Sequence, residues 1–247
     1  MTNLLEVKNV SKNFGGVIAN HDISLVVPEG KIIGLIGPNG SGKTTLFNSI
    51  VGYHPIDQGQ VMFKGDDISH LLVPDIARMG LLRTFQQTRI YGGMSCMKNM
   101  QISVPHTHDT FSMMFQRHQT EIIDRAEELM EFVGLYSKRH LLAGDLSFGQ
   151  QKLLEFAMAL MNEPKLLLLD EPTAGINPTL INGLIDRLQK ANEMLGITLL
   201  VIEHNMRVIM NLAEHIYCLA HGEMLADGNP DALQNDQRVI DAYLGAS

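Results

Sequence analysis

A glycine-rich segment, residues 37–44, has the composition and spacing of a loop that binds nucleotide phosphates. It reads Gly-Pro-Asn-Gly-Ser-Gly-Lys-Thr, which matches GxxxxGK followed by Ser or Thr, and it comes directly after the apolar run Lys31–Ile36. Glycines let a backbone curl so that successive N–H groups point at one phosphate, and a helix that begins there adds its positive dipole end. An ordinary glycine turn is the alternative, but the predicted strand before the loop and the predicted helix after it favour phosphate binding.

Two residues at the end of this loop could act on the phosphates directly. Lys43 would supply a full positive charge to the β- and γ-phosphates. The hydroxyl of Thr44 is a hard oxygen ligand of the kind that Mg²⁺ prefers. The loop therefore predicts binding of ATP together with Mg²⁺.

Two adjacent carboxylates follow a second apolar run, Leu166–Leu169. Successive side chains of a strand point to opposite faces, so Asp170 and Glu171 would serve different purposes. Asp170 would hold Mg²⁺, through a water molecule, and Glu171 would polarise the attacking water. A solvated strand end is the alternative for such a pair. The phosphate loop in the same chain favours a catalytic site.

A second helix start lies at residues 146–150, Leu-Ser-Phe-Gly-Gln, ahead of an apolar-periodic helix expected over Gln151–Asn162. Ser147 stands where an N-cap belongs, and a simple capped helix is one interpretation. The chain would then have two helix starts suited to phosphate but a catalytic pair for only one nucleotide. Head-to-tail pairing of two chains resolves this, because the second helix start of one subunit can close over the γ-phosphate held by the other.

Composition limits the class of protein. The chain has 247 residues, 45% of them hydrophobic and 19% charged, which is enough apolar material for a core. A net charge of -8 argues against a surface built for nucleic acid. Cys96 and Cys218 are expected to be inert thiols of a reducing compartment, and residues 1–10 do not form an export signal. The longest apolar runs fall well short of the roughly 20 residues that a membrane helix needs.

The order of elements predicts an α/β fold in which a sheet is covered on both faces. Between residues 91 and 145 the character changes: β-branched runs become rare and Glu121–Val133 has a helical pattern, which predicts an inserted helical lobe with a loop over Val104–His118. The histidines of this region lack the spacing of metal ligands and are expected to face solvent. The predicted strands of the core are Leu4–Val10, Ile23–Val27, Lys31–Ile36, Leu166–Leu169 and Thr198–Ile202, and its predicted helices begin at Lys43, Pro178 and Met206.

The ordered set of motifs resembles the ATPase subunits of ATP-binding cassette (ABC) transporters. This set is the phosphate loop, Gln86, LSFGQ, LLLLDEP and His204, and the resemblance spans essentially the whole chain. Four sequence segments are most similar to those of the ATPases of branched-chain amino acid importers, with urea importers close behind. These segments are RTFQ at residues 83–86, LSFGQQ, DEPTAGINP and VIEHNM.

The resemblance implies a specific architecture. One ABC ATPase domain would span residues 1–247, with a P-loop NTPase core formed by residues 1–90 and 146–247. The core would contain a mixed sheet and an antiparallel N-terminal β-subdomain. Residues 91–145 would form the inserted α-helical subdomain.

The resemblance also implies roles for individual residues. Phe14 would stack on adenine, with a place in the core as the alternative. Gln86 would touch Mg²⁺ and the attacking water, and His204 would contact the γ-phosphate, so that the catalytic set is Glu171, His204, Lys43 and Gln86. The Mg²⁺ ligands would be Thr44, Gln86 and Asp170. Besides Phe14, the ATP-binding residues would be Gly37, Pro38, Asn39, Gly40, Ser41, Gly42, Lys43, Thr44 and Thr45. Leu146, Ser147, Phe148, Gly149 and Gln150 would act on the nucleotide of the partner subunit.

Two positions depart from the common family pattern. Phe148 replaces the first glycine of the usual LSGGQ, which changes how closely the backbone can approach a phosphate there. Asn177 stands in the segment after the acidic pair, which lacks the aspartate that many relatives have, and would make a weaker contact across subunits.

The partners and the location also follow from the resemblance. Integral membrane permeases, a second ABC ATPase of identical or sister type and, indirectly, a solute-binding protein are the expected partners, and no nucleic acid is expected. The chain would be cytoplasmic and peripheral on the inner face of the cell membrane. A nucleic-acid or ribosome ATPase would need a coiled-coil insertion, tandem cassettes or a basic face. A stand-alone phosphotransferase or GTPase would not need LSFGQ or His204.

Overall fold

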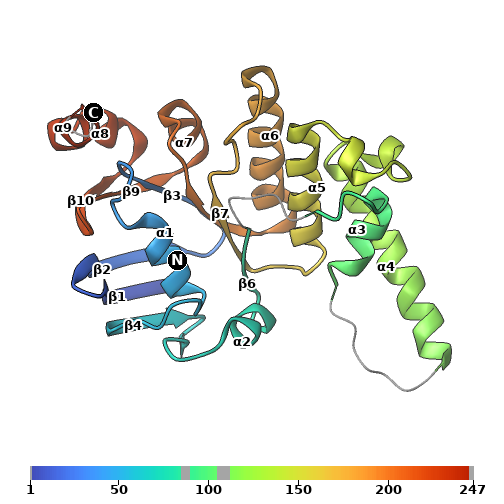
Figure 1. Ribbon diagram of the computed structural model, residues 1–247, viewed down its shortest axis with the longest axis horizontal. Helices are drawn as coiled ribbons and strands as arrows, with labels where there is room; N and C mark the ends of the chain where they lie inside the picture. The colour runs from blue at the N-terminus through green and yellow to red at the C-terminus, as the bar shows by residue number, and fades with distance from the viewer. Residues whose placement is uncertain (1, 85–89, 105–111, 245–247) are drawn as a thin grey trace. The chain divides into compact units, whose positions relative to one another are not determined.

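The computed structural model describes residues 2–84, 90–104 and 112–244 of the chain (Figure 1). These residues fall into two compact units. The first comprises residues 1–83, 165–172 and 188–247, and the second comprises residues 84–164 and 173–187. The boundaries of the expected helical insertion, residues 91 and 145, remain predictions.

The first unit is built around a six-stranded sheet in the order β10-β9-β3-β8-β7-β6. Its β3 (Ile32–Ile36), β7 (Leu166–Asp170) and β8 (Thr198–Ile202) are buried at every residue, as parallel strands covered on both faces should be. The strands β6 (Leu81–Arg83) and β9 (His215–Ala220) extend the parallel pairing on either side. Only β10 (Glu223–Gly228) runs antiparallel, paired with β9. The fold class is therefore α/β, as the sequence predicts.

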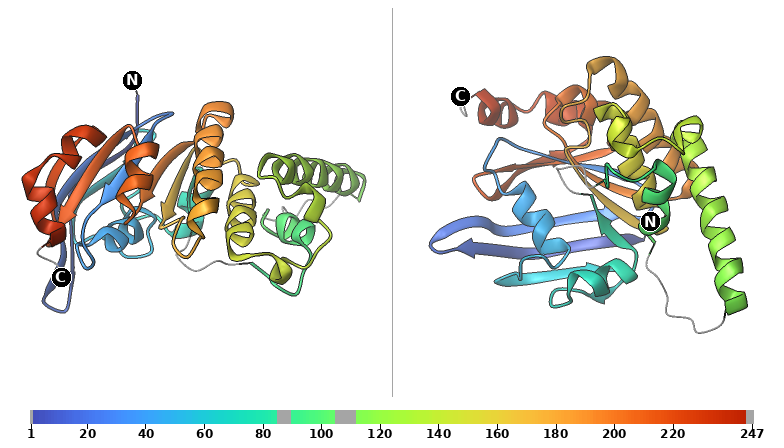
Figure 2. Two further views of the ribbon diagram at one scale, coloured as in Figure 1. Left: turned by 90° about the horizontal axis from the view of Figure 1, so that it is seen from above. Right: turned by 45° about the vertical axis from the view of Figure 1, so that its right-hand side comes forward.

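A second, antiparallel sheet lies in the N-terminal part of the same unit. Its order is β2-β1-β4-β5, formed by β1 (Asn3–Phe14), β2 (Val17–Pro28), β4 (Gln58–Phe63) and the short β5 (Asp66–Asp67). Figure 1 and the right-hand view of Figure 2 both show α1 (Lys43–Ile50) between the two sheets. Its side chains Leu46, Phe47 and Ile50 are buried in one core with residues of both sheets. The helix that carries Lys43 is thus held from two sides.

Shorter helices complete the first unit. The helix α7 (Met206–Leu212) packs on the other face of the six-stranded sheet, where its Ile209 lies so close to Gly34 that a Cβ there would come within 2.8 Å of it. The helices α8 (Pro230–Gln234) and α9 (Gln237–Leu244) follow β10, and α2 (Val73–Arg78) precedes β6. The long helix α6 (Pro178–Leu195) has residues in both units.

The second unit is helical. It contains α3 (Cys96–Ile102), α4 (Ser112–Phe132) and α5 (Phe148–Leu160), which contact one another pairwise, and 3-10 turns at Tyr136–Lys138 and Ala143–Asp145 (Figure 2, left). The loop predicted over Val104–His118 is wrong from residue 112 onward, because α4 already begins at Ser112. Residues 112–118 include good helix formers such as Met, Gln and Arg, which outweigh the irregular composition just before them. Residues 105–111 lie outside the described ranges.

Candidate functional site

The glycine-rich loop joins the end of β3 to the start of α1, and its backbone takes conformations that glycine favours. Gly42 is the N-cap of α1 at φ 97°. A Cβ at this position would lie 2.3 Å from the carbonyl oxygen of Ala19 and 2.5 Å from Nδ2 of Asn20. Asn20, fully buried in β2, donates from Nδ2 to the Gly42 carbonyl at 3.2 Å. The loop is therefore seated directly on β2, with no room for a side chain at Gly42.

Lys43 turns its ammonium group into the curve of this loop. Its Nζ donates to the carbonyl oxygens of Gly37 at 2.8 Å and Pro38 at 2.9 Å, and it lies 3.4 Å from Oγ of Ser41. The residue is only 5% exposed. Burial lowers the pKa of this ammonium, and the negative charges of Glu171 and Asp170 oppose that shift. The predicted cation and the predicted carboxylates thus interact electrostatically in one site.

Asp170 ends β7 and is held by an arginine that the motifs did not assign to the site. Its Oδ2 accepts from Arg83 at 2.6 Å, and the two side chains are 1% and 7% exposed. Arg83 lies at the end of the neighbouring strand β6, and its guanidinium also donates to Oδ1 of Asn48 on α1. The other carboxylate oxygen of Asp170, Oδ1, is buried and has no hydrogen-bond partner among the described residues. A buried acceptor of this kind fits a water molecule bound to Mg²⁺.

Glu171 and His204 form a hydrogen-bonded pair at the neighbouring strand ends. Nε2 of His204 lies 2.5 Å from Oε1 of Glu171, and the backbone N–H of Glu171 donates to the carbonyl of Ile202 at 2.9 Å. Glu171 has a left-handed backbone, φ 51°, which costs on the order of 1–3 kcal/mol for a non-glycine residue. Strain of this kind concentrates where a side chain must be aimed for function.

Phe14 lies at the end of β1, and the residue is 43% exposed. It makes an edge contact with His54, with ring centroids 5.2 Å apart, and the Nζ of Lys12 lies 5.3 Å from its centroid. The ring is not part of the core, so the alternative of a core aromatic is wrong.

The second helix start, in the helical unit, is capped as predicted. The Oγ of Ser147 accepts from the backbone N–H of Gln150 at 3.4 Å, and the side chain of Gln150 accepts from the backbone N–H of Ser147 at 3.1 Å. This reciprocal capping box starts α5 at Phe148, three residues before the predicted start. Gly149 is buried, and a Cβ there would lie 3.3 Å from Leu180.

The two departures from the family pattern have local explanations. The ring of Phe148 packs on Gly175, where a Cβ would come within 2.9 Å of it, so Phe148 lies over the segment that follows the acidic pair. Asn177 accepts through Oδ1 from the backbone N–H and the hydroxyl of Thr179, at 3.1 and 2.9 Å. Within its own chain Asn177 therefore stabilises the first turn of α6.

The structure describes most of the other predicted site residues. Thr44 is exposed and Thr45 half-buried on the first turn of α1, while Pro38, Asn39 and Gly40 line a small cavity beside α9. Gln86 lies outside the described ranges. Sequence reasoning assigned no site role to Arg83 or Asn48. Arg83 ends β6, three strands away from β3 in the sheet order, so no local pattern predicts its contact with Asp170.

Comparison with known proteins decides the family. The family model for the ABC transporter matches residues 20–174, which include the phosphate loop, the capped helix start and the acidic pair. The chain belongs to the ABC transporter family. A second model, described as branched-chain amino acid ATP-binding cassette transporter, matches residues 223–247.

Individual relatives agree with this assignment over nearly the whole chain. The probable branched-chain amino acid transport ATP-binding protein LivG of Archaeoglobus fulgidus is 36% identical, with 98% of this chain and 96% of the relative covered. The high-affinity branched-chain amino acid transport ATP-binding protein BraF of Pseudomonas aeruginosa is also 36% identical, with 98% of each chain covered. The crystal structure of the ADP conformation of an ATP-binding cassette of an ABC transporter has a TM-score of 0.88 and 30% identity, covering 99% of this chain and 100% of that one.

The protein is therefore the ATP-binding, ATP-hydrolysing subunit of an ABC transporter, and its fold is that of an ABC ATPase cassette. Among the helices of the described ranges, none has both the length and the apolar character needed to cross a bilayer. The sequence-based assignment to this family is confirmed.

Replacing Arg83 by methionine is expected to destabilise the protein. Because the change leaves the Asp170 carboxylate buried without its cation, the free energy of unfolding should fall by about 3–5 kcal/mol. The matched control is Arg78→Met, which breaks an exposed ion pair with Asp75 and should change stability by less than about 1 kcal/mol. Urea unfolding of both variants measures the difference, and equal stabilities would contradict the role given to Arg83.

Proposed function

We propose that this ATPase energises the import of a branched-chain or other hydrophobic amino acid. The observation that carries this proposal is the match of residues 223–247 to the branched-chain amino acid model, a segment outside the general ABC transporter match. The relatives' names point the same way. Integral permeases that the chain does not itself contain would form the pathway, with a solute-binding protein delivering the cargo, and the ATPase would lie on the cytoplasmic face of the membrane.

The phosphate loop and Lys43 would grip the nucleotide. The N–H groups of residues 40–45 and the dipole of α1 would face the phosphates, and Lys43 would exchange the carbonyls of Gly37 and Pro38 for phosphate oxygens. Phe14 would cover one face of adenine. Thr44, Asp170 and Gln86 would hold Mg²⁺, which when bound neutralises charge on the phosphates. The buried, unpartnered Oδ1 of Asp170 supports this assignment.

Glu171 and His204 would activate water. The carboxylate of Glu171 would accept a hydrogen bond from the water whose oxygen attacks the γ-phosphorus, as the bond to the β-phosphate oxygen breaks. His204, already 2.5 Å from that carboxylate, would hold it in place and contact the γ-phosphate. Lys43 would stabilise the negative charge on the transferred group. The reaction converts ATP and water to ADP and phosphate.

A second ATPase subunit would complete each site. The N-terminus of α5, with Ser147 and Gly149, has backbone N–H groups and a positive dipole end suited to a phosphate. In a head-to-tail pair, identical or sister in type, this helix start would close over the γ-phosphate held by the other subunit. ATP would close the pair and move the permeases, and loss of the γ-phosphate would reopen it.

Changing Glu171 to glutamine is expected to separate binding from hydrolysis. The variant should keep its affinity for MgATP while turnover in the assembled transporter falls about a hundredfold or more, because the base that orients water is lost. A closed dimer should accumulate, visible by light scattering. Glu163→Gln is the matched control, since Glu163 also has a left-handed backbone, φ 46°, and is exposed outside the site. Turnover of Glu171→Gln at the control's rate would refute the assignment.

The cargo can be tested with the subunits that co-purify with the chain from detergent-solubilised membranes. We expect permeases and, after reconstitution with the cognate binding protein, ATPase activity that leucine, isoleucine or valine stimulates. Urea serves as the control cargo, since urea importers have the next most similar motifs. Stimulation by urea and not by the amino acids would overturn the amino-acid proposal and leave the ATPase assignment intact.

A further inference from the structure

The last described helix reaches the first residue of the phosphate loop. The backbone N–H of Gly37 donates to the hydroxyl oxygen of Tyr243 on α9 at 2.8 Å, across 206 residues of sequence. Burial raises the pKa of Tyr243 to about 12, so the hydroxyl is neutral at physiological pH. A contact of this kind lies outside every motif that identified the nucleotide site.

Gly37 is restricted on its other sides as well. Its carbonyl oxygen accepts from Nζ of Lys43 at 2.8 Å. A Cβ at Gly37 would lie 2.1 Å from the carbonyl oxygen of Leu219, at the end of β9. The residue is therefore held by α9 through its N–H and by the catalytic cation through its carbonyl. Any shift of Gly37 would also move the carbonyl that binds Lys43.

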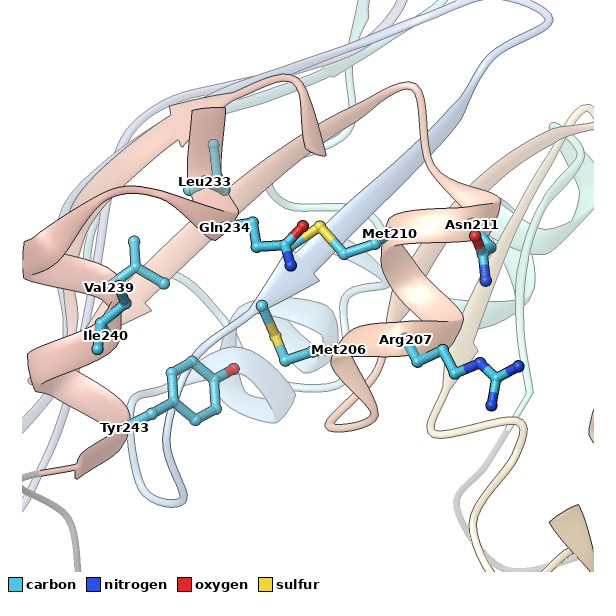
Figure 3. Close-up of a pocket in the computed structure, with 9 residues that line it drawn as sticks. All are labelled: Met206, Arg207, Met210, Asn211, Leu233, Gln234, Val239, Ile240 and Tyr243. Carbon is cyan, nitrogen blue, oxygen red and sulfur yellow. The ribbon is translucent and has the colours of Figure 1, made fainter. Parts of the chain in front are cut away.

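Tyr243 is half-buried and shares one face of α9 with a buried residue. Val239, four residues earlier and so on the same helical face, is 2% exposed. Figure 3 shows Tyr243 and Val239 on one side of an apolar groove, with Met206 and Met210 of α7 on the other. A separate cavity of about 190 Å³ lies between loop residues 38–41 and the α9 residues Asp241 and Ala242. The hydroxyl of Tyr243 thus makes a direct hydrogen bond to the loop beside this cavity.

We propose that α9 braces the phosphate loop and that Tyr243 is a positioning residue for nucleotide binding. The proposal rests on the proposed nucleotide site. It gives the segment that matches the branched-chain amino acid model, residues 223–247, a direct part in the ATPase. Tyr243 acts through Gly37 and does not touch the nucleotide.

The physical reason is a change of partners at Lys43. When phosphate oxygens replace the carbonyls of Gly37 and Pro38 as its acceptors, the loop loses two internal hydrogen bonds. The bond from Gly37 to Tyr243 is not among them and would keep the start of the loop in place. Without the hydroxyl, the loop would have more conformations to lose when nucleotide binds, which weakens binding and leaves the bound site unchanged.

The variant Tyr243→Phe tests this with the full-length chain, because it keeps the ring and removes only the hydroxyl. One net hydrogen bond corresponds to a MgATP affinity about fivefold weaker. In the assembled transporter KM for ATP should rise by a similar factor while kcat stays within about twofold. Amide hydrogen exchange at Gly37 should become faster.

Tyr217→Phe is the matched control. The hydroxyl of Tyr217 also bonds to backbone groups, the N–H and carbonyl of Val26 at 3.1 Å each, and burial also raises its pKa. This variant should leave MgATP affinity and Gly37 exchange unchanged, even if it lowers thermal stability. A loss of affinity common to both variants would indicate general destabilisation and would contradict the proposal that Tyr243 positions the phosphate loop.

The outcomes separate the two proposals. If wild-type protein binds MgATP and Tyr243→Phe binds it equally well, the brace is wrong and the nucleotide site stands. A fall in kcat with unchanged KM would also contradict a positioning role in binding. If wild-type protein fails to bind MgATP, the nucleotide site itself is wrong.

Discussion

The ammonium group of Lys43, buried in a loop whose backbone oxygens bind it, is the interaction on which the rest of the site depends. A buried cation is costly unless hydrogen bonds and opposite charges compensate it, and here two carbonyl groups and the nearby carboxylates of Asp170 and Glu171 do so. The loop can take this shape because glycines occupy the positions where a side chain would collide with neighbouring backbone. Phosphate oxygens offer the ammonium stronger partners than carbonyls do, because they carry charge.

The sheet supplies the other half of the site. The carboxyl ends of parallel strands lie at the same edge of a sheet. Because β3, β7 and β8 are parallel, the phosphate loop, Asp170 and His204 lie at one edge. Arg83, from a fourth strand, fixes the Asp170 carboxylate through one oxygen. The backbone strain at Glu171 and the burial of Lys43 both cost stability, and the large core shared by both sheets and α1 offsets that cost.

Local patterns predicted a large part of this arrangement, because phosphate loops, strand-end carboxylates and helix caps are encoded within a few neighbouring residues. Such patterns predict the α/β class and the capped start of α5 at Ser147. The role of His204 follows only from the family resemblance, because a single histidine after a strand does not by itself predict a catalytic function. Its contact with Glu171 spans 33 residues of sequence. The loop predicted over Val104–His118 is wrong from Ser112 onward, because the irregular composition just before this residue hides the helix propensity of residues 112–118.

What the sequence could not reveal are the contacts between distant segments. Arg83 meets Asp170 across 87 residues, and Tyr243 meets Gly37 across 206, so no spacing rule connects either pair. Such pairs can be recognised as neighbours only once the order of the strands is known. Arg83 and Tyr243 hold other residues of the site in place. Motifs therefore identify the reacting groups of this ATPase more readily than the residues that position them.

Titration calorimetry of the purified full-length chain with MgATP tests the central assignment most directly, with Lys43→Ala as the comparison. We expect one nucleotide per chain for the wild-type protein and at least a tenfold loss of affinity in the variant, which removes the buried ammonium and keeps the glycines of the loop. If wild-type protein binds no MgATP, or if Lys43→Ala binds it as tightly, the loop before α1 is not the phosphate site and the account is wrong.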